Sequence, residues 1–71
     1  MEKKTIEQVI AFFGTQSELG RLLGVSQQSI RHWISRGHIP LRRALQIEEV
    51  SDGKIRLKDI LHLTNKIGGL K

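Results

Sequence analysis

One stretch of the chain decides the fold: residues 16–33, Gln16-Ser-Glu-Leu-Gly-Arg-Leu-Leu-Gly-Val-Ser-Gln-Gln-Ser-Ile-Arg-His-Trp33. It predicts a helix, a sharp turn at Gly24 and a second helix capped by Ser26, because glycine accepts left-handed backbone and serine satisfies free donors at a helix start. Two helices that cross steeply also need a small residue where their backbones approach, and Gly20 stands there. Alanine is expected to fit there as well, so glycine costs the helix about 1 kcal/mol. The stretch therefore predicts a helix-turn-helix.

Capping residues and glycines mark the helices around this stretch. Thr5 with Gln8, and Thr15 with Glu18, form the capping-box pattern, in which each side chain satisfies the other residue's free backbone donor. Between the two boxes, apolar residues recur at the spacing of a one-sided helix. Three helices are therefore predicted, each ending at a glycine: one from residue 5 to 14, one from 15 to 24 and one from 26 to 37.

The chain after residue 37 is compatible with two structures. Pro40 suits the first turn of a fourth helix, where its missing N–H is no loss. The apolar side of this helix would consist of Leu41, Ala44, Leu45 and Ile47. A turn at residues 51–53 and a short fifth helix would follow, the latter with Leu57, Ile60 and Leu61. Alternatively, Asp52-Gly53 is a hairpin turn that leads into an alternating strand.

The helical alternative is favoured because residues 40–46 are rich in strong helix formers and contain no β-branched residue. We therefore predict the all-α class, as a compact bundle of about five short helices that contains the helix-turn-helix. A C-terminal β-hairpin remains the alternative. The helix-turn-helix domain would span residues 1–63, and residues 64–71, which include two adjacent glycines, would form a flexible tail.

Composition bounds the possible functions. The 71 residues include 12 Lys and Arg against 7 Asp and Glu, and the net charge of +5 favours an anionic partner. There is no cysteine and no clustered partner for the three histidines, so no disulfide, metal or other cofactor is expected. No apolar run is long enough to cross a bilayer, and no signal peptide or small-molecule site is evident. We expect a protein of the bacterial cytoplasm, associated with the nucleoid.

The third predicted helix separates into two faces at about 100° per residue. Ile30, Trp33 and Ile34 share the arc that would pack into the core. The opposite arc holds side chains that can hydrogen-bond to DNA bases, since glutamine pairs with adenine and arginine with guanine. The N-terminal end of such a helix enters the major groove deepest. The predicted base contacts are Gln27, Gln28, Arg31 and His32.

Contacts to the DNA backbone are predicted around the ends of this helix and at the start of the second. Gln16 opens the second helix, where its side chain and the free backbone donors can hold a phosphate. The other predicted backbone contacts are Ser26, Ser35, Arg36, Arg42 and Arg43. A solvated surface explains Gln16, Arg42 and Arg43 equally well. Glu48 falls inside the apolar arc of the fourth helix, where we expect an ion pair with a nearby arginine, or alternatively a role in a dimer interface.

Residues 16–33 resemble the helix-turn-helix of phage Cro and repressor proteins, and Val25-Ser-Gln-Gln-Ser-Ile is close to repressor-type recognition helices. Phe13-Gly-Thr-Gln, the turn at 24–26 and the Ile39-Pro40 start of the fourth helix are similar to small all-helical Cro-like and YdaS-like prophage regulators. The resemblance covers roughly residues 5–62. It implies a lambda-repressor-like domain of five helices that binds operator DNA, usually as a dimer. Some Cro-like proteins instead have a β-sheet in the C-terminal half.

A transcriptional regulator of double-stranded operator DNA is therefore the expected function. A weak homodimer would place two recognition helices about 34 Å apart, which predicts a palindromic operator. Two other functions stay open: a protein-interaction or antitoxin-like module that uses the helix-turn-helix as a scaffold, and a DNA-binding excision or recombination factor. No enzyme is expected, because the sequence shows no nucleophile and base pattern, no phosphate-cradling glycine loop and no metal-ligand cluster.

Overall fold

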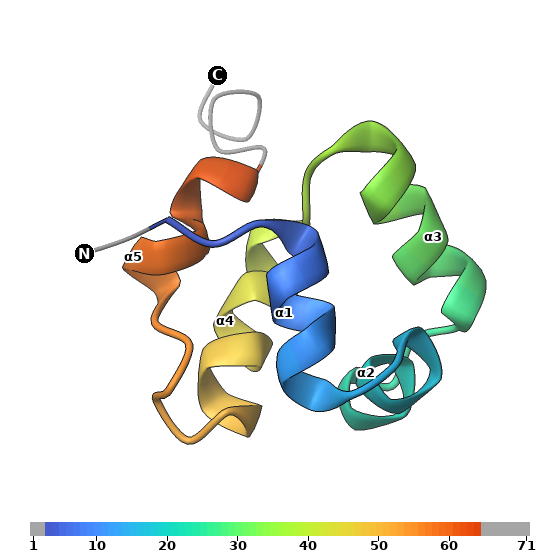
Figure 1. Ribbon diagram of the computed structural model, residues 1–71, viewed down its shortest axis with the longest axis horizontal. Coiled ribbons are helices and arrows are strands. Elements are labelled where there is room, and N and C mark those ends of the chain that lie inside the picture. The colour runs from blue at the N-terminus through green and yellow to red at the C-terminus, as the bar shows by residue number, and fades with distance from the viewer. Residues whose placement is uncertain (1–2, 65–71) are drawn as a thin grey trace.

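The computed structural model describes residues 3–64, which fold into five short α-helices and a terminal 3-10 helix (Figure 1). In chain order these are α1 (Ile6–Phe13), α2 (Gln16–Leu23), α3 (Gln27–Arg36), α4 (Leu41–Val50), α5 (Leu57–Ile60) and η1 (Leu61–Leu63). In Figure 1, α5 lies at one end of the bundle and α3 at the other, with α1 and α4 between them. The predicted all-α class is confirmed.

The alternative of a C-terminal β-hairpin is wrong, because residues 3–64 contain no strand. Asp52 and Gly53 do form a tight turn, with φ of 59° and 81°. That turn closes the C-terminus of α4, since the Gly53 N–H donates to the Glu48 carbonyl at 3.0 Å. The next buried residue, Ile55, donates its N–H to the Ser51 hydroxyl at 2.9 Å. The backbone groups that a hairpin would pair across strands are thus satisfied locally.

The helix starts follow the predicted capping residues. At α1 the capping box is complete: the Gln8 N–H donates to Thr5 Oγ1 at 3.1 Å, and the Thr5 N–H donates to Gln8 Oε1 at 2.8 Å. At α2 only half of the predicted box forms, with the Glu18 N–H donating to Thr15 Oγ1 at 3.1 Å. The other half is absent because the Glu18 carboxylate pairs with Arg21 on the exposed side of the same helix.

The fourth helix begins one residue later than predicted and turns a different side to the core. Pro40 is its N-cap, ahead of the first helical residue. Ala44 and Ile47 are fully buried, whereas Leu41 and Leu45, which we assigned to the apolar side, are 45% and 49% exposed. The buried side of α4 is set by contacts with α2 and α5, and these contacts cannot be derived from the spacing of apolar residues within one helix.

The segment after α5 is packed into the fold. Leu61, one of the three apolar residues from which the short fifth helix was predicted, follows α5 in η1 and is 38% exposed, while Leu63 and Thr64 are buried. The segment is tied to the connection between α3 and α4, since the Ile39 N–H donates to the Leu63 carbonyl at 2.6 Å and Ile39 forms an isolated parallel bridge with Thr64. Thr64, the first residue of the predicted tail, therefore belongs to the folded part. The rest of that tail, residues 65–71, lies outside the described residues.

One core joins these elements. Each described helix contributes at least one of its members, which are Ile6, Val9, Leu19, Leu23, Ile30, Trp33, Ile39, Ala44, Ile47, Ile55, Ile60 and Leu63. Trp33 is 7% exposed, which confirms that the single tryptophan packs inside. Burial of these side chains is the main force that holds the short helices together, since helices of this length are not stable alone in water.

Gly20 lies where the turn of the helix-turn-helix folds back onto α2. A Cβ built on this residue would lie 2.8 Å from the Val25 carbonyl oxygen. The expectation that alanine fits here is therefore wrong, because the obstructing atom belongs to the backbone of the turn and cannot rotate away. The Val25 N–H also donates to the Gly20 carbonyl at 2.9 Å, which fixes this approach. Gly24 supplies the left-handed step of the turn, with φ of 75°.

Candidate nucleic-acid interface

Helix α3 lies at the edge of the bundle, with one side held by the core (Figure 1). Its N-cap is Ser26, whose hydroxyl accepts the Ser29 N–H at 3.1 Å, and its C-cap is Gly37. Its inner side packs against α1 and α2 through Ile30 and Trp33, which are 0% and 7% exposed. The core thus fixes the orientation of α3 and leaves the opposite side to solvent.

The solvent side of α3 carries the polar residues that the sequence assigns to it. Six of its residues are exposed, and together they are termed the α3 outer face: Gln27, Gln28, Arg31, His32, Ser35 and Arg36. The residues 27–36 include no Asp or Glu, so the outer face carries no carboxylate. Amides and a hydroxyl that both donate and accept lie beside cationic groups, and this combination suits base edges and phosphates.

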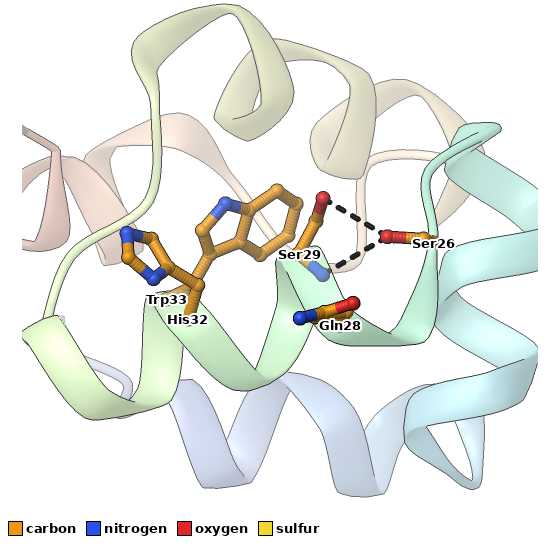
Figure 2. A pocket seen from close by; sticks show the side chains of 5 residues that line it. All are labelled: Ser26, Gln28, Ser29, His32 and Trp33. Atoms are coloured by element: carbon orange, nitrogen blue, oxygen red, sulfur yellow. Dashed lines mark hydrogen bonds between the residues drawn. The ribbon is translucent and has the colours of Figure 1, made fainter.

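The outer face is tied to α2 through a side-chain hydrogen bond. Ser17 Oγ, in the first turn of α2, donates to Gln27 Oε1 at 3.3 Å. This bond occupies the acceptor of the Gln27 amide and leaves its NH2 group free to donate. The neighbouring Gln28 forms no hydrogen bond with the residues drawn around it in Figure 2, so its donor and its acceptor are both available.

A shallow hollow of about 290 Å³ lies on the flank of α3 (Figure 2). Its lining residues are Ser26, Gln28, Ser29, His32 and Trp33. Ser26 Oγ donates to Ser29 Oγ at 3.2 Å, so the hydroxyls at this end are held by one another. Two of the lining residues, Gln28 and His32, also belong to the α3 outer face. The hollow is therefore continuous with the surface predicted to meet DNA bases.

The residues predicted to contact the DNA backbone lie in different settings. Ser35 and Arg36 are exposed on α3, and Arg42 is exposed on α4. Ser26 is exposed as well, but its hydroxyl caps α3. Gln16 is half-buried at the first position of α2, and its Oε1 is enclosed with no hydrogen-bond partner within residues 3–64. An enclosed oxygen of this kind costs about 1–3 kcal/mol, and it leaves the amide nitrogen as the group that can donate to a phosphate.

Arg43 is turned toward the protein. Its Nη1 donates to the Leu23 carbonyl at 3.3 Å and to Gln46 Oε1 at 2.5 Å, and Gln46 Nε2 donates to the same carbonyl at 3.4 Å. Leu23 is the last residue of α2, so its carbonyl has no partner within that helix. The half-buried Arg43 therefore caps α2 from the neighbouring α4, and we leave it out of the proposed DNA contacts.

Glu48 is half-buried on α4 and forms no ion pair with any residue between 3 and 64. The salt bridge in this part of the chain joins Arg21 to Glu18, two exposed residues of α2. The ion pair predicted between Glu48 and a nearby arginine is thus not found among the described residues. Arg43, the half-buried arginine of the same helix, donates instead to the Leu23 carbonyl and to the Gln46 side-chain amide oxygen.

Two serines of this surface are not among the predicted DNA contacts. Ser17 holds Gln27 from another helix, and no periodicity within a helix relates residues on two different helices. Ser29 lines the hollow. It lies about 100° around α3 from Gln28, at the boundary between the inner and outer arcs, so the helical spacing would have identified it.

Within residues 3–64, no group of three or more His, Cys, Asp and Glu side chains is placed to hold a metal ion. None of the helices in that range has both the length and the apolar character needed to cross a membrane.

Residues 5–66 match the family model described as the DNA-binding transcriptional regulator Cro. No curated protein and no solved structure matches the chain. The matched range contains all five helices described above, including the helix-turn-helix and the whole of the α3 outer face. The family consists of DNA-binding regulators and not of enzymes. The chain therefore belongs to the family of phage Cro DNA-binding transcriptional regulators, whose partner is double-stranded DNA.

Proposed function

We propose that this protein binds a specific operator by placing α3 in the major groove of DNA. The observation that carries the proposal is the α3 outer face, which presents six exposed polar or basic side chains and no carboxylate. The other side of the same helix is buried in the core. A helix whose orientation is fixed in this way presents its side chains to base pairs in one defined geometry, which specific recognition requires.

The base contacts are assigned to the exposed residues nearest the start of α3. Gln28 has a free donor and a free acceptor, so it can form the bidentate pair with adenine. Gln27 accepts from Ser17 and therefore donates to an acceptor on a base edge. Arg31 suits guanine, and His32 lies beside the hollow on the flank of α3, where it contacts a base or a phosphate.

The DNA backbone contacts are assigned to Gln16, Ser26, Ser35 and Arg36. Gln16 lies at the N-terminus of α2, where free N–H groups and the helix dipole favour a phosphate. Arg36 is in the last turn of α3 and supplies a charge that attracts the backbone of any sequence. Such contacts set the register of α3 in the groove, while the glutamines and Arg31 distinguish one sequence from another.

We further propose that two copies bind one operator together, and that the operator is a palindrome. Two recognition helices related by a two-fold axis would enter successive major grooves about 34 Å apart. Binding over a promoter would then regulate transcription. The protein would act in the bacterial cytoplasm, bound to the DNA of the nucleoid.

Selection of preferred sites from random duplex DNA tests the proposal. We expect a recovered palindrome with half-sites separated by about one helical turn. Weak binding to every sequence would contradict the proposal and would favour a protein-interaction module that uses the helix-turn-helix as a scaffold. A reporter gene placed behind the recovered operator then tests regulation. A change in expression supports the transcriptional regulator, and unchanged expression despite specific binding favours an excision or recombination factor.

Substitutions then assign the site to α3. Gln28→Ala and Arg31→Ala should each cost about 1–3 kcal/mol of discrimination between the operator and a mutated half-site. Arg56→Ala is the matched control, since Arg56 is exposed at the start of α5, at the other end of the bundle from α3, and its loss removes the same charge (Figure 1). Equal effects of Arg31→Ala and Arg56→Ala on discrimination would refute the assignment to α3.

A further inference from the structure

Helix α4 exposes an apolar stripe that nothing within residues 3–64 covers. Leu41 and Leu45 are 45% and 49% exposed, and they lie one turn apart. The side of α4 that adjoins this stripe is buried through Ala44 and Ile47, so the helix cannot rotate to hide the leucines. Two half-exposed leucines one turn apart form a small apolar patch on a rigid helix, and its burial against a partner would be favourable.

The charges that flank this stripe have opposite signs at its two ends. Arg42 is exposed in the first turn of α4, and Glu49 is exposed in the last. At about 100° and 1.5 Å per residue, Arg42 and Glu49 lie within about 20° of each other around the helix and about 10 Å apart along it. They therefore occupy the same flank of the stripe that contains Leu41 and Leu45, one residue at each end.

We infer that this stripe is an interface with a second copy of the same chain, in which two α4 helices pack antiparallel with Leu45 close to the two-fold axis. The two-fold axis is perpendicular to both helices and to the line that joins them. The flanks that carry Arg42 and Glu49 therefore lie on the same side of the helix pair, and the N-terminal end of one helix lies beside the C-terminal end of the other. Arg42 of one copy then meets Glu49 of the other, and the same pair forms a second time. A surface that is complementary to itself in this way suits an isologous dimer.

The inference gives Arg42 a partner other than the DNA phosphate that the sequence predicts for it. The inferred interface depends on the proposed function in one respect only: on the operator, it would be the surface through which the two bound copies contact each other. The pairing itself is measured without DNA. Because one helix pair buries far less than the roughly 1,600 Å² of a standard stable interface, we expect a weak dimer, with a dissociation constant of roughly 10 µM to 1 mM.

Removal of the apolar contact is the first test. Sedimentation velocity of the full chain without DNA, at concentrations across that range, should show a monomer–dimer equilibrium that Leu45→Gln weakens at least about tenfold, since both copies lose the contact. Phe12→Gln is the matched control: Phe12 is 48% exposed, so the change removes comparable apolar surface from another helix, α1. Circular dichroism of each variant checks that the fold is intact.

Charge reversal is the second and stricter test. Arg42→Glu alone and Glu49→Arg alone should each weaken association roughly tenfold, because each turns both attractive pairs into repulsive ones. A mixture of the two single variants should restore the dimer as a heterodimer, since both cross pairs then join an arginine to a glutamate. Net charge alone predicts a different result: Arg42→Glu lowers the repulsion between two copies of charge +5 and would strengthen association.

Three results would overturn the inference: no dimer of the natural sequence at about 1 mM, a dimer indifferent to Leu45→Gln, or single charge reversals that act in opposite directions and are not rescued by mixing. None of these results bears on whether α3 reads DNA. A protein that recovers a specific half-site but fails these tests keeps its proposed function and loses this interface. A protein that passes them but selects no DNA sequence keeps the interface and loses the function.

Discussion

At the scale of single residues, the turn of the helix-turn-helix depends on the missing side chain of Gly20. The Val25 carbonyl oxygen lies 2.8 Å from the position that a Cβ would take, which is closer than such a contact tolerates. Intrinsic helix propensity acts in the opposite direction, since alanine is favoured over glycine by about 1 kcal/mol within a helix. The balance between these two effects is open to measurement.

We expect Gly20→Ala to destabilise the fold by about 1–3 kcal/mol, because the turn must move away from α2 and overpacking of this kind exceeds the gain in propensity. The free energy of unfolding from urea titration is the quantity to compare. A variant more stable than the natural sequence, as helix propensity alone predicts, would show that the turn yields without strain.

The hydrogen bond from Ser17 to Gln27 also belongs to this scale, since it orients one recognition side chain from another helix. Ser17→Ala should reduce discrimination between operator and mutated half-site, by less than Gln27→Ala does. In the background of Gln27→Ala, the same change should have no further effect, because the interaction is already lost. Fluorescence anisotropy titrations of the four proteins form the required cycle. Additive losses would mean that Ser17 acts on DNA directly and not through Gln27.

At the scale of helices, the end of α2 is held by a side chain from α4. Arg43 and Gln46 both donate to the Leu23 carbonyl, so two helices that are far apart in sequence share one capping interaction. A charged donor on a helix C-terminus also interacts favourably with the helix dipole. The helix-turn-helix is thereby anchored to the second half of the bundle at the point where its turn begins.

Replacement of Arg43 by methionine, which keeps an unbranched apolar stem but removes the guanidinium, should lower the free energy of unfolding by about 1–2 kcal/mol. Arg42→Met is the matched control, since Arg42 lies next to it in the same turn but is exposed, and it should change stability by less than about 0.5 kcal/mol. Thermal and urea unfolding at low protein concentration provide the comparison. Equal losses in both variants would contradict the role of Arg43 as a cap.

At the scale of the whole molecule, the net charge of +5 attracts the protein to DNA of any sequence, while the side chains of α3 are proposed to distinguish one sequence from another. Release of counterions makes the logarithm of the binding constant fall linearly with the logarithm of salt concentration, with a slope set by the number of phosphates neutralised. Charge and recognition can therefore be separated by salt titration.

Arg36→Ala should reduce the magnitude of this salt slope by about 0.9, which corresponds to one phosphate contact, with little change in sequence preference. Gln28→Ala should leave the slope unchanged and alter the preference. Binding constants on operator and unrelated DNA at several salt concentrations provide both quantities. An unchanged slope for Arg36→Ala would remove Arg36 from the proposed backbone contacts.

Much of the fold was accessible from local sequence. The three helices of the first half begin and end at the predicted caps and glycines, and the inner and outer arcs of α3 agree with the observed burial. These features depend on interactions within about four residues, so a pattern of neighbours is enough to predict them. The capping box at Thr15 formed only in part because the Glu18 carboxylate pairs with Arg21 and does not accept from the Thr15 N–H. The box pattern takes no account of such a competing ion pair.

The sequence by itself determined the helix-turn-helix, the polar face of α3 and the positive charge, because each depends on residue type and short spacing. Only the tertiary structure decided that Gly20 excludes alanine, that Ser17 orients Gln27, that Arg43 faces inward and that Leu41 and Leu45 face outward. Each of these depends on how one helix is positioned against another helix or against the turn that follows it. That position is set by the packing of the whole core, and no single segment of the chain contains it.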